Sequence, residues 1–388
     1  MRGFSARKAA VLVVVAANVF PACLVGVMLI LNFVTGNHVS DFLSYWAASK
    51  QLVHHVNPYD ADSVFRLQLP EGLPSGTPAV LMRNPPVIFP LVYPLGYLGP
   101  AAATRVWMLV LAICFAGSVA VLGRVYRLDR RVWLVLTFEP ALHCLNAEQI
   151  GLILALSLSL FLYLHEKRPF LAGAALSLLT LKPHLFVPGM VVVIAWAFWE
   201  WRVRLIAGAA ISTALLCAAA WFIDPLGWHE YRALLHDVAV GNEWIPCVSI
   251  LLRSHLPGAP VWAQYIPSAL SSIGALWLYL KNRESWDWRE RAPMLIAFGI
   301  VTAPYTWFTD QAAMVPLALF ALARPARSLF TFAALNGALM LLPLASVNLH
   351  SVWLAWSSAA FFAWTVFDRW SVHVEGRGRV LKPALSAE

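Results

Sequence analysis

Residues 9–33 read AAVLVVVAANVFPACLVGVMLILNF, an apolar run that contains no charged side chain. About 20 consecutive apolar residues are enough to cross the hydrocarbon core of a bilayer. The run is longer than the roughly 7–15 apolar residues of a cleaved signal peptide, and Arg2, Arg7 and Lys8 precede it. We therefore interpret it as an uncleaved first membrane helix whose N-terminus lies in the cytoplasm.

The composition of the whole chain extends this interpretation. Of 388 residues, 60% are hydrophobic and 12% are charged, and the mean hydropathy is +0.69. Soluble domains carry about 25% charged residues, so a water-soluble, disordered or disulfide-rich secreted protein is excluded. The net charge of +8 falls in short clusters between apolar runs, which indicates membrane orientation and not nucleic-acid binding.

Two kinds of apolar segment follow the first one. Runs long enough to span a membrane lie at 102–123, 204–222, 262–280, 328–346 and 351–367. Shorter or broken runs lie at 86–99, 132–145, 150–165, 170–181, 184–199, 292–308 and 311–323. Helices that break inside a membrane are tolerated where protein or a water-filled cavity satisfies the backbone. The broken runs therefore predict a polar cavity among the helices.

The Lys and Arg clusters set the predicted topology. If they all face the cytoplasm, the chain is an all-α integral membrane protein with about 12 transmembrane helices and with both termini inside. In this topology the segment 86–99 is re-entrant. In the alternative topology 86–99 spans the membrane fully and 132–145 is re-entrant. We expect one membrane domain over 1–388. Its two long outer loops, 34–85 and 223–261, are expected to form amphipathic helices on the outer face and to contribute to the functional site.

The first outer loop contains a candidate catalytic carboxylate. Asp41 follows the first helix by about eight residues, and Tyr45 comes one helical turn later on the same face. The pair Ser40–Asp41 also suits a helix N-cap. Local sequence leaves both interpretations open.

Later breaks in the apolar pattern supply cations. Lys182 lies between two apolar runs, where a charge costs about 2.5–3.5 kcal/mol and is by default functional, although a lysine at a helix end can also snorkel. His184 extends the same polar break. Arg253 in the second outer loop is the next candidate, with a solvated charge on an amphipathic helix as the alternative. Arg83 and Arg105 are weaker candidates.

Further polar side chains fall on the same outward-facing breaks. They are Gln149, Tyr305, Trp307 and Asp310. Tyr and Trp combine an apolar ring face that can stack on a ligand with a polar atom that donates hydrogen bonds. Their convergence predicts an outward-facing cavity, whereas the alternative is a belt of interfacial aromatic residues with a solvated aspartate.

No metal or cofactor is predicted. His54, His55, Asp60 and Asp62 have no metal-ligand spacing, and the five cysteines form no CxxC pattern. Glu139 and His143 are four residues apart on an expected helix, and we interpret them as a structural pair.

Five strings in a consistent order carry a family resemblance. They are DFLSYWAAS…NPYD (41–60), NPPVIFPLVYPLGYL (84–98), EQIGLILALSLSLFLYL (148–164), AGAALSLLTLKPHLFVPGM (172–190) and APYTWFTDQAAMVPLALFAL (303–322). Together they resemble the membrane glycosyltransferases of family 87, which have the GT-C architecture and take a sugar, typically mannose, from polyprenyl phosphate. The chain departs from that pattern where Asn84 replaces a tyrosine and where Glu148-Gln149-Ile150-Gly151 replaces Gly-Gln-x-Asn.

The resemblance implies an activity and roles for residues. Sugar transfer to a hydroxyl needs a base for the hydroxyl proton and positive charge for the departing phosphate. Asp41 is implied as the base, which would act with inversion by analogy with GT-C enzymes. The remaining expected site residues are, for the donor phosphate, Lys182, Arg253 and His184, and, for sugar and acceptor, Tyr45, Gln149, Tyr305 and Asp310.

The implied partners are a polyprenyl-phosphate sugar donor, a lipid or glycan acceptor and membrane lipids, without nucleic acid. The expected location is the cell (inner) membrane, with the active site on its extracytoplasmic face. A multi-span transporter or flippase for a lipid-linked or sugar substrate is the alternative function, although no internal repeat is visible. A membrane assembly partner without activity is a third possibility.

Overall fold

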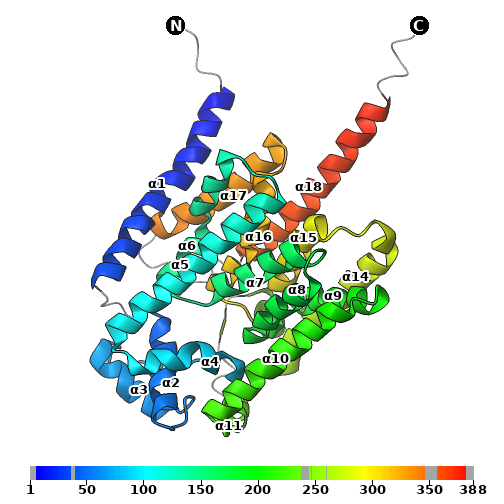
Figure 1. Ribbon diagram of the computed structural model, residues 1–388. Helices are drawn as coiled ribbons and strands as arrows, with labels where there is room; N and C mark the ends of the chain where they lie inside the picture. Colours follow the sequence, from blue (N-terminus) through cyan, green and yellow to red (C-terminus); the bar gives the residue numbers. More distant parts are fainter. Residues whose placement is uncertain are drawn as a thin grey trace, which may run out of the picture.

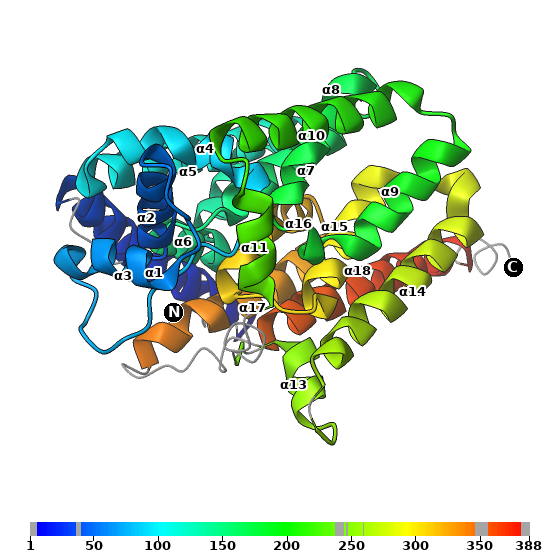
Figure 2. The same ribbon diagram turned by 90° about the horizontal axis from the view of Figure 1, so that it is seen from below.

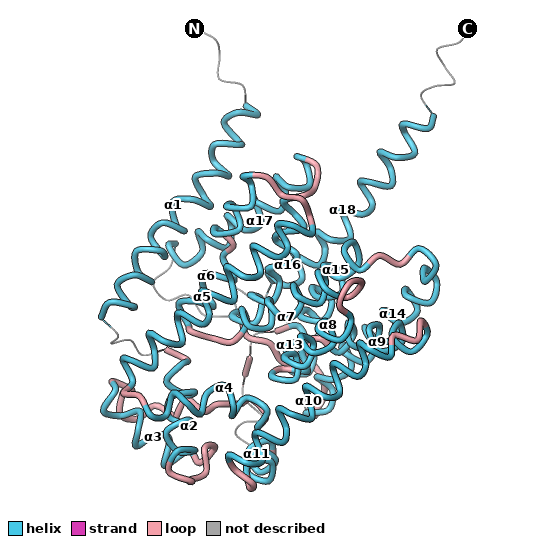
Figure 3. The backbone as a smooth tube through the Cα atoms, in the orientation of Figure 1, coloured by secondary structure: helices cyan, strands magenta, loops and turns pink. Residues whose placement is uncertain are grey.

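The computed structural model describes residues 6–35, 40–236, 244–245, 247–258, 260–345 and 356–381. Within these ranges the chain forms helices and loops and no strand (Figure 3). The α-helices are α1 (Ala6–Thr35), α2 (Phe42–Val53), α3 (Ala61–Gln68), α4 (Phe89–Val92), α5 (Pro100–Val125), α6 (Glu139–Ala147), α7 (Gly151–Leu164), α8 (Pro169–Leu176), α9 (Val187–Trp199), α10 (Val203–Ile223), α11 (Gly227–Leu235), α13 (Val248–Ser254), α14 (Ile266–Asn282), α15 (Trp288–Thr302), α16 (Val315–Leu322), α17 (Ala326–Ala345) and α18 (Trp356–Leu381).

Short 3-10 helices connect or extend many of these elements. They are η1 (Leu69–Glu71), η2 (Pro86–Ile88), η3 (Tyr93–Tyr97), η4 (Arg130–Thr137), η5 (Ser177–Leu181), η6 (Pro183–Leu185), η7 (Val261–Tyr265), η8 (Arg283–Ser285) and η9 (Phe308–Met314). Prolines stand in the first turn of η2 and η6, where a missing N–H costs nothing. The expected breaks in the apolar runs are thus real interruptions of helix.

Three helices of the described chain, α1, α5 and α10, have both the length and the apolar composition to cross a membrane. Large apolar side chains of α1 are exposed along its length, which suits contact with lipid. The chain is therefore a helical membrane protein, while the larger number of spans expected from the sequence stays a prediction.

The two ends of the molecule differ in content. The start of α1 and the end of α18 lie at one end, and α2, α3, α4 and α11 lie at the opposite end (Figure 1). The view from below confirms that α11 stands in front of the bundle at this second end (Figure 2). The segment from η2 through η3, residues 86–97, belongs to the second end and is too short to cross a hydrocarbon core of about 30 Å.

The expectation of a surface amphipathic helix is wrong for α2. Its residues Tyr45 and Leu52 are each only 1% exposed, and nearly every other residue of the helix is also buried. The helix packs against α3, α4, α5 and η3, so protein covers its whole circumference. The periodicity of apolar residues could not reveal this, because it identifies the apolar face of a helix and not how many neighbours cover its other faces.

Two glycines bring α8 and α10 into direct backbone contact. A Cβ on Gly173 would lie 2.0 Å from the carbonyl oxygen of Leu205, and a Cβ on Gly208 would lie 2.0 Å from that of Phe170. Small residues at such crossings let helices in membranes approach closely. This contact anchors α8, which leads through η5 to the polar break at Lys182.

Candidate active site

A polar cavity of about 340 Å³ lies beside the start of α2. Side chains from residues 41–84, from the α6–α7 turn, from the η5–η6 break, from Ile245 and from residues 305–310 line it together. The lining residues are Asp41, Ser44, Tyr45, Pro78, Ala79, Val80, Leu81, Met82, Arg83, Asn84, Gln149, Lys182, His184, Ile245, Tyr305, Trp307 and Asp310. Seven of the eight side chains expected at the site are among them, and Arg253 is not.

Asp41 sits at the N-cap position of α2, but its side chain makes no capping hydrogen bond. Instead, Gln149 Nε2 donates to Asp41 Oδ2 at 2.9 Å, and the first free amide of the helix, that of Phe42, donates to Ser40 Oγ at 3.2 Å. No other described residue hydrogen-bonds the Asp41 carboxylate. Ser40 therefore caps the helix, and the half-buried Asp41 carboxylate lines the cavity.

Gln149 is the centre of the polar network. Its Oε1 accepts from the Tyr45 hydroxyl at 2.9 Å and lies 3.5 Å from Lys182 Nζ. Two donors on this oxygen determine the orientation of the amide, so the NH₂ group must face Asp41. Burial, with smaller contributions from the charges of Asp41 and Asp310, raises the pKa of Tyr45 well above its ordinary value. The phenol therefore stays protonated and keeps its role as donor.

Lys182 is held by a buried ion pair. It lies between η5 and η6, and its Nζ is 2.6 Å from Asp310 Oδ1, with the lysine side chain 12% and the aspartate side chain 1% exposed. The second oxygen, Asp310 Oδ2, accepts the backbone N–H of Trp307 at 3.0 Å. Asp310 was expected to contact sugar or acceptor. Both of its oxygens are engaged, which fits a role in orienting Lys182.

His184 and Tyr305 form a stacked wall of the cavity. Their ring centroids are 4.0 Å apart at an interplanar angle of 28°. Among the described atoms, His184 Nε2 is buried and has no hydrogen-bond partner. A buried polar atom on a cavity wall with no partner is a natural contact for a bound ligand.

Arg83 and Asn84 lie at the end of the loop that leads into η2. Arg83, a weaker candidate in the sequence, lines the cavity and is half-buried. Asn84, which departs from the family pattern, is buried, and its Nδ2 donates to the carbonyl of Leu181 at 2.9 Å. The Tyr59 hydroxyl donates to the carbonyl of Asn84 at 2.8 Å. Asn84 therefore fixes the backbone immediately before Lys182.

The loop segment 78–82 forms a side of the cavity that sequence reasoning missed. Gln68, which is fully buried in α3, pairs with both backbone groups of Val80: its Nε2 donates to the carbonyl at 2.8 Å, and its Oε1 accepts the amide at 3.0 Å. The segment contains no charged or aromatic residue that could have indicated this role.

Arg253 lies elsewhere. It is a buried residue of α13, and its Nη1 donates to Gln264 Oε1 at 2.8 Å. The structure does not bring it into the cavity lining with Lys182 and His184. The nearby Ile245, Cys247 and Ile250 pack against Tyr305 and Trp307, and Ile245 itself lines the cavity.

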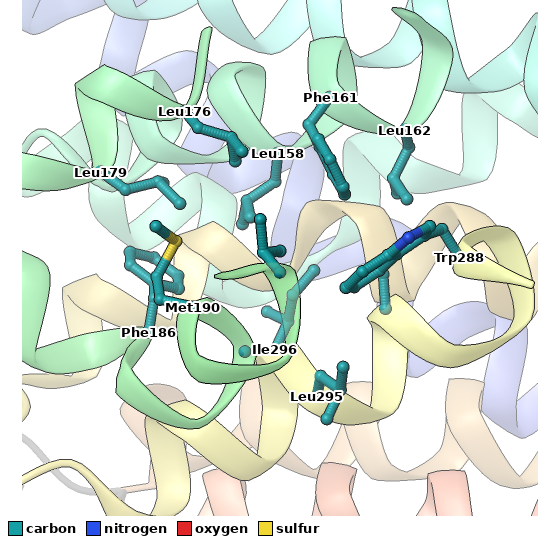
Figure 4. A pocket seen from close by; sticks show the side chains of 13 residues that line it. Leu158, Phe161, Leu162, Leu176, Leu179, Phe186, Met190, Trp288, Leu295 and Ile296 are labelled. Carbon is teal, nitrogen blue, oxygen red and sulfur yellow. The ribbon is translucent and has the colours of Figure 1, made fainter. Parts of the chain in front are cut away.

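A second pocket is apolar and lies between α7, α8 with η5, α9 and α15 (Figure 4). It holds only about 30 Å³ of open space, and its labelled side chains are aliphatic or aromatic apart from the thioether of Met190. It is too small for a sugar and lacks acid–base groups, so it is not a candidate for the active site. Among the described residues, no group of three or more His, Cys, Asp or Glu side chains is placed to hold a metal ion.

The fold and the cavity define a helical membrane protein whose broken helices gather carboxylates, cations and stacked rings at one end. The family model of glycosyltransferase family 87 matches residues 83–303, which is more than half of the chain. The chain therefore belongs to glycosyltransferase family 87, and its activity is the transfer of a sugar from a donor to an acceptor. No curated protein and no solved structure matches the chain.

The matched region divides the site residues. Gln149, Lys182, His184 and Arg253 lie within residues 83–303. Asp41 and Tyr45 precede it, and Tyr305 and Asp310 follow it. The cavity is thus built jointly by the matched region and by the segments on either side of it.

Proposed function

We propose that this glycosyltransferase moves a sugar, with mannose as the first candidate, from a polyprenyl-phosphate donor to a hydroxyl of a lipid or glycan. The observation that carries the proposal is the meeting of one carboxylate, Asp41, with cations in a single cavity, where Gln149 lies between Asp41 and Lys182. Such a pairing matches the two needs of the reaction, a base for the acceptor and positive charge for the leaving phosphate.

Asp41 acts as the general base in this proposal. The acceptor oxygen attacks the anomeric carbon of the donor sugar while an oxygen of the Asp41 carboxylate takes the hydroxyl proton. The bond between the anomeric carbon and the phosphate oxygen breaks, and polyprenyl phosphate leaves with the electron pair. The hydrogen bond from Gln149 to Asp41 Oδ2 supports this role, because it holds one oxygen and leaves the other to meet the acceptor.

Lys182, His184 and Arg83 are assigned to the donor phosphate. Lys182 is neutralised in part by Asp310, so Arg83 adds the charge that the phosphate needs. His184 Nε2, which is buried and has no hydrogen-bond partner within the described part of the chain, supplies a further polar contact. Arg253 stays a prediction, since it donates to Gln264 outside the cavity lining. Tyr45, Gln149 and Tyr305 are assigned to sugar and acceptor.

The reaction is proposed to occur at the extracytoplasmic face of the cell membrane. The support is the position of α2 at the end of the molecule opposite the start of α1 and the end of α18, together with the basic residues Arg7 and Lys8 in the first turn of α1.

Purified protein in liposomes, supplied with polyprenyl-phosphate mannose and a membrane lipid extract, tests the proposal by mass spectrometry. A lipid product heavier by one hexose is expected. Asp41→Asn should lower the rate by about 10²–10⁴-fold, whereas Asp62→Asn, an exposed aspartate in the first turn of α3, should leave it unchanged. Full activity of Asp41→Asn would remove the base, and uptake of the donor without any glycosidic product would favour transport instead.

A further inference from the structure

The turn between α6 and α7 contains a glutamate where helix-ending turns normally place glycine. Glu148 has φ 59° and ψ 35°, the left-handed conformation. Its N–H donates to the carbonyl of Leu145, and the N–H of Gln149 donates to that of Cys144. This is the Schellman pattern, in which glycine is preferred because a Cβ is unfavourable in the left-handed region. A side chain held at such a position has to be explained by what it contacts.

The Glu148 side chain is almost completely buried, at 1% exposure, and contacts the start of α2. Its Oε2 accepts a hydrogen bond from the Ser40 hydroxyl at 2.6 Å. This distance lies at the short end of the usual range for a hydrogen bond between a hydroxyl and an oxygen acceptor. The same Ser40 oxygen accepts the amide of Phe42, so the contact reaches the first turn of the helix that carries Asp41.

Two adjacent residues of the α6–α7 turn therefore hold the two adjacent residues at the start of α2. Glu148 holds Ser40, and Gln149 holds Asp41 through its Oδ2 at 2.9 Å. The turn itself is anchored, because the Trp107 indole donates to the carbonyl of Glu148 at 2.7 Å. The first contact fixes the backbone beside Asp41, and the second fixes its carboxylate.

We propose that Glu148 is a positioning residue for Asp41: its carboxylate, through Ser40, sets the first turn of α2 so that the Asp41 carboxylate meets the acceptor hydroxyl. This inference rests on the proposed role of Asp41 as general base. It assigns Glu148 no contact with substrate. The side chain acts through its acceptor oxygen and not through its charge.

Four variants separate this role from a structural one. Glu148→Ala and Ser40→Ala should each lower kcat about 10- to 100-fold, as expected when a catalytic group loses its alignment. The donor KM should stay within about twofold, because Lys182 and Arg83 are untouched. Glu148→Gln keeps an acceptor oxygen for Ser40 and should retain most of kcat. Combining the two alanine variants should cost no more than either alone.

Glu148→Gly gives the sharpest result. Glycine suits the left-handed turn, so the thermal midpoint should stay equal or rise while kcat falls to the level of Glu148→Ala. Arg127→Gly is the matched control, since Arg127 also has a positive φ of 50° but is exposed and outside the cavity lining. Arg127→Gly should leave the thermal midpoint equal or raise it, as Glu148→Gly does, and should leave kcat unchanged.

A readout that does not need turnover completes the test. Hydrogen exchange of the peptide 40–46 should speed up in Glu148→Ala and Ser40→Ala, and stay native in Glu148→Gln and Arg127→Gly. Native kcat in Glu148→Gly, or unchanged exchange in Glu148→Ala, would overturn the proposal. So would loss of kcat in Glu148→Gln with a displaced pH profile, which would indicate an effect of charge.

Failure of this inference and failure of the proposed function are distinguishable. If Asp41→Asn is inactive while Glu148→Ala and Glu148→Gly are fully active, only the positioning role is wrong. If Asp41→Asn is fully active, Asp41 is not the base, and the exchange measurement alone decides whether Glu148 holds the start of α2.

Discussion

Replacing Asp310 by asparagine leaves Lys182 as a buried cation without its partner. Asparagine keeps an oxygen for the N–H of Trp307, so the charge is the main thing removed. At 2.6 Å the gross attraction of the pair is about 6 kcal/mol with an effective dielectric constant near 20. Desolvation offsets part of this, and breaking a buried pair from one side costs about 3–5 kcal/mol in measured cases. We expect Asp310→Asn to lower the free energy of unfolding by about 3 kcal/mol, at the lower end of this range, because the cavity lets water reach the freed ammonium of Lys182.

The double variant Lys182→Met with Asp310→Asn removes both charges. It should recover most of the loss and lie within about 1 kcal/mol of the parent, since an uncharged pair needs no desolvation. The free energy of unfolding in detergent micelles, followed by tryptophan fluorescence, measures all variants. Glu200→Gln is the matched control: Glu200 lies at the same 2.6 Å from Arg202, but both side chains are about one-third exposed, so the cost should be below about 1 kcal/mol.

The reasoning is refuted if Asp310→Asn is no less stable than Glu200→Gln. It is also refuted if the double variant is destabilised by the sum of its two single changes, because additivity would mean that the charges do not interact.

Gly208→Leu should destabilise the fold by about 1–3 kcal/mol or more, because the new side chain meets a backbone carbonyl of α8. Gly274→Leu on α14 is the control and should be neutral, because nothing lies within 4 Å of a Cβ at that position. Unfolding midpoints compare the two variants. Burial, with the neighbouring carboxylate adding, raises the pKa of Glu230 on α11 to about 7. The folded state then binds more protons than the unfolded state between about pH 4.5 and 7, so stability falls as pH rises through this window, and Glu230→Gln should raise the thermal midpoint at pH 8 and not at pH 4. Asn84→Ala should lower sugar transfer about 10-fold with a modest loss of stability, because the hydrogen bond to the carbonyl of Leu181 is lost; unchanged kinetics would show that this contact does not position the lysine break.

Several features of the fold could be predicted because they depend on local composition. The apolar runs, the prolines and the interrupting polar residues indicated a helical membrane protein with broken helices. The pair Glu139 and His143 was expected from spacing alone, and the two side chains lie 3.6 Å apart. The same local logic failed for α2, since burial on every side depends on neighbours that are distant in sequence.

The sequence by itself determined the membrane class, the family and a set of polar residues at helix breaks. Only the tertiary structure decided which of them meet: Gln149 holds Asp41 across a separation of 108 residues, and Asp310 holds Lys182 across 128. It also brought Arg83 into the cavity lining and left Arg253 beside Gln264. The physical reason is that hydropathy is a sum over adjacent residues, whereas ion pairs and hydrogen bonds depend on atomic positions that exist only after the helices have packed.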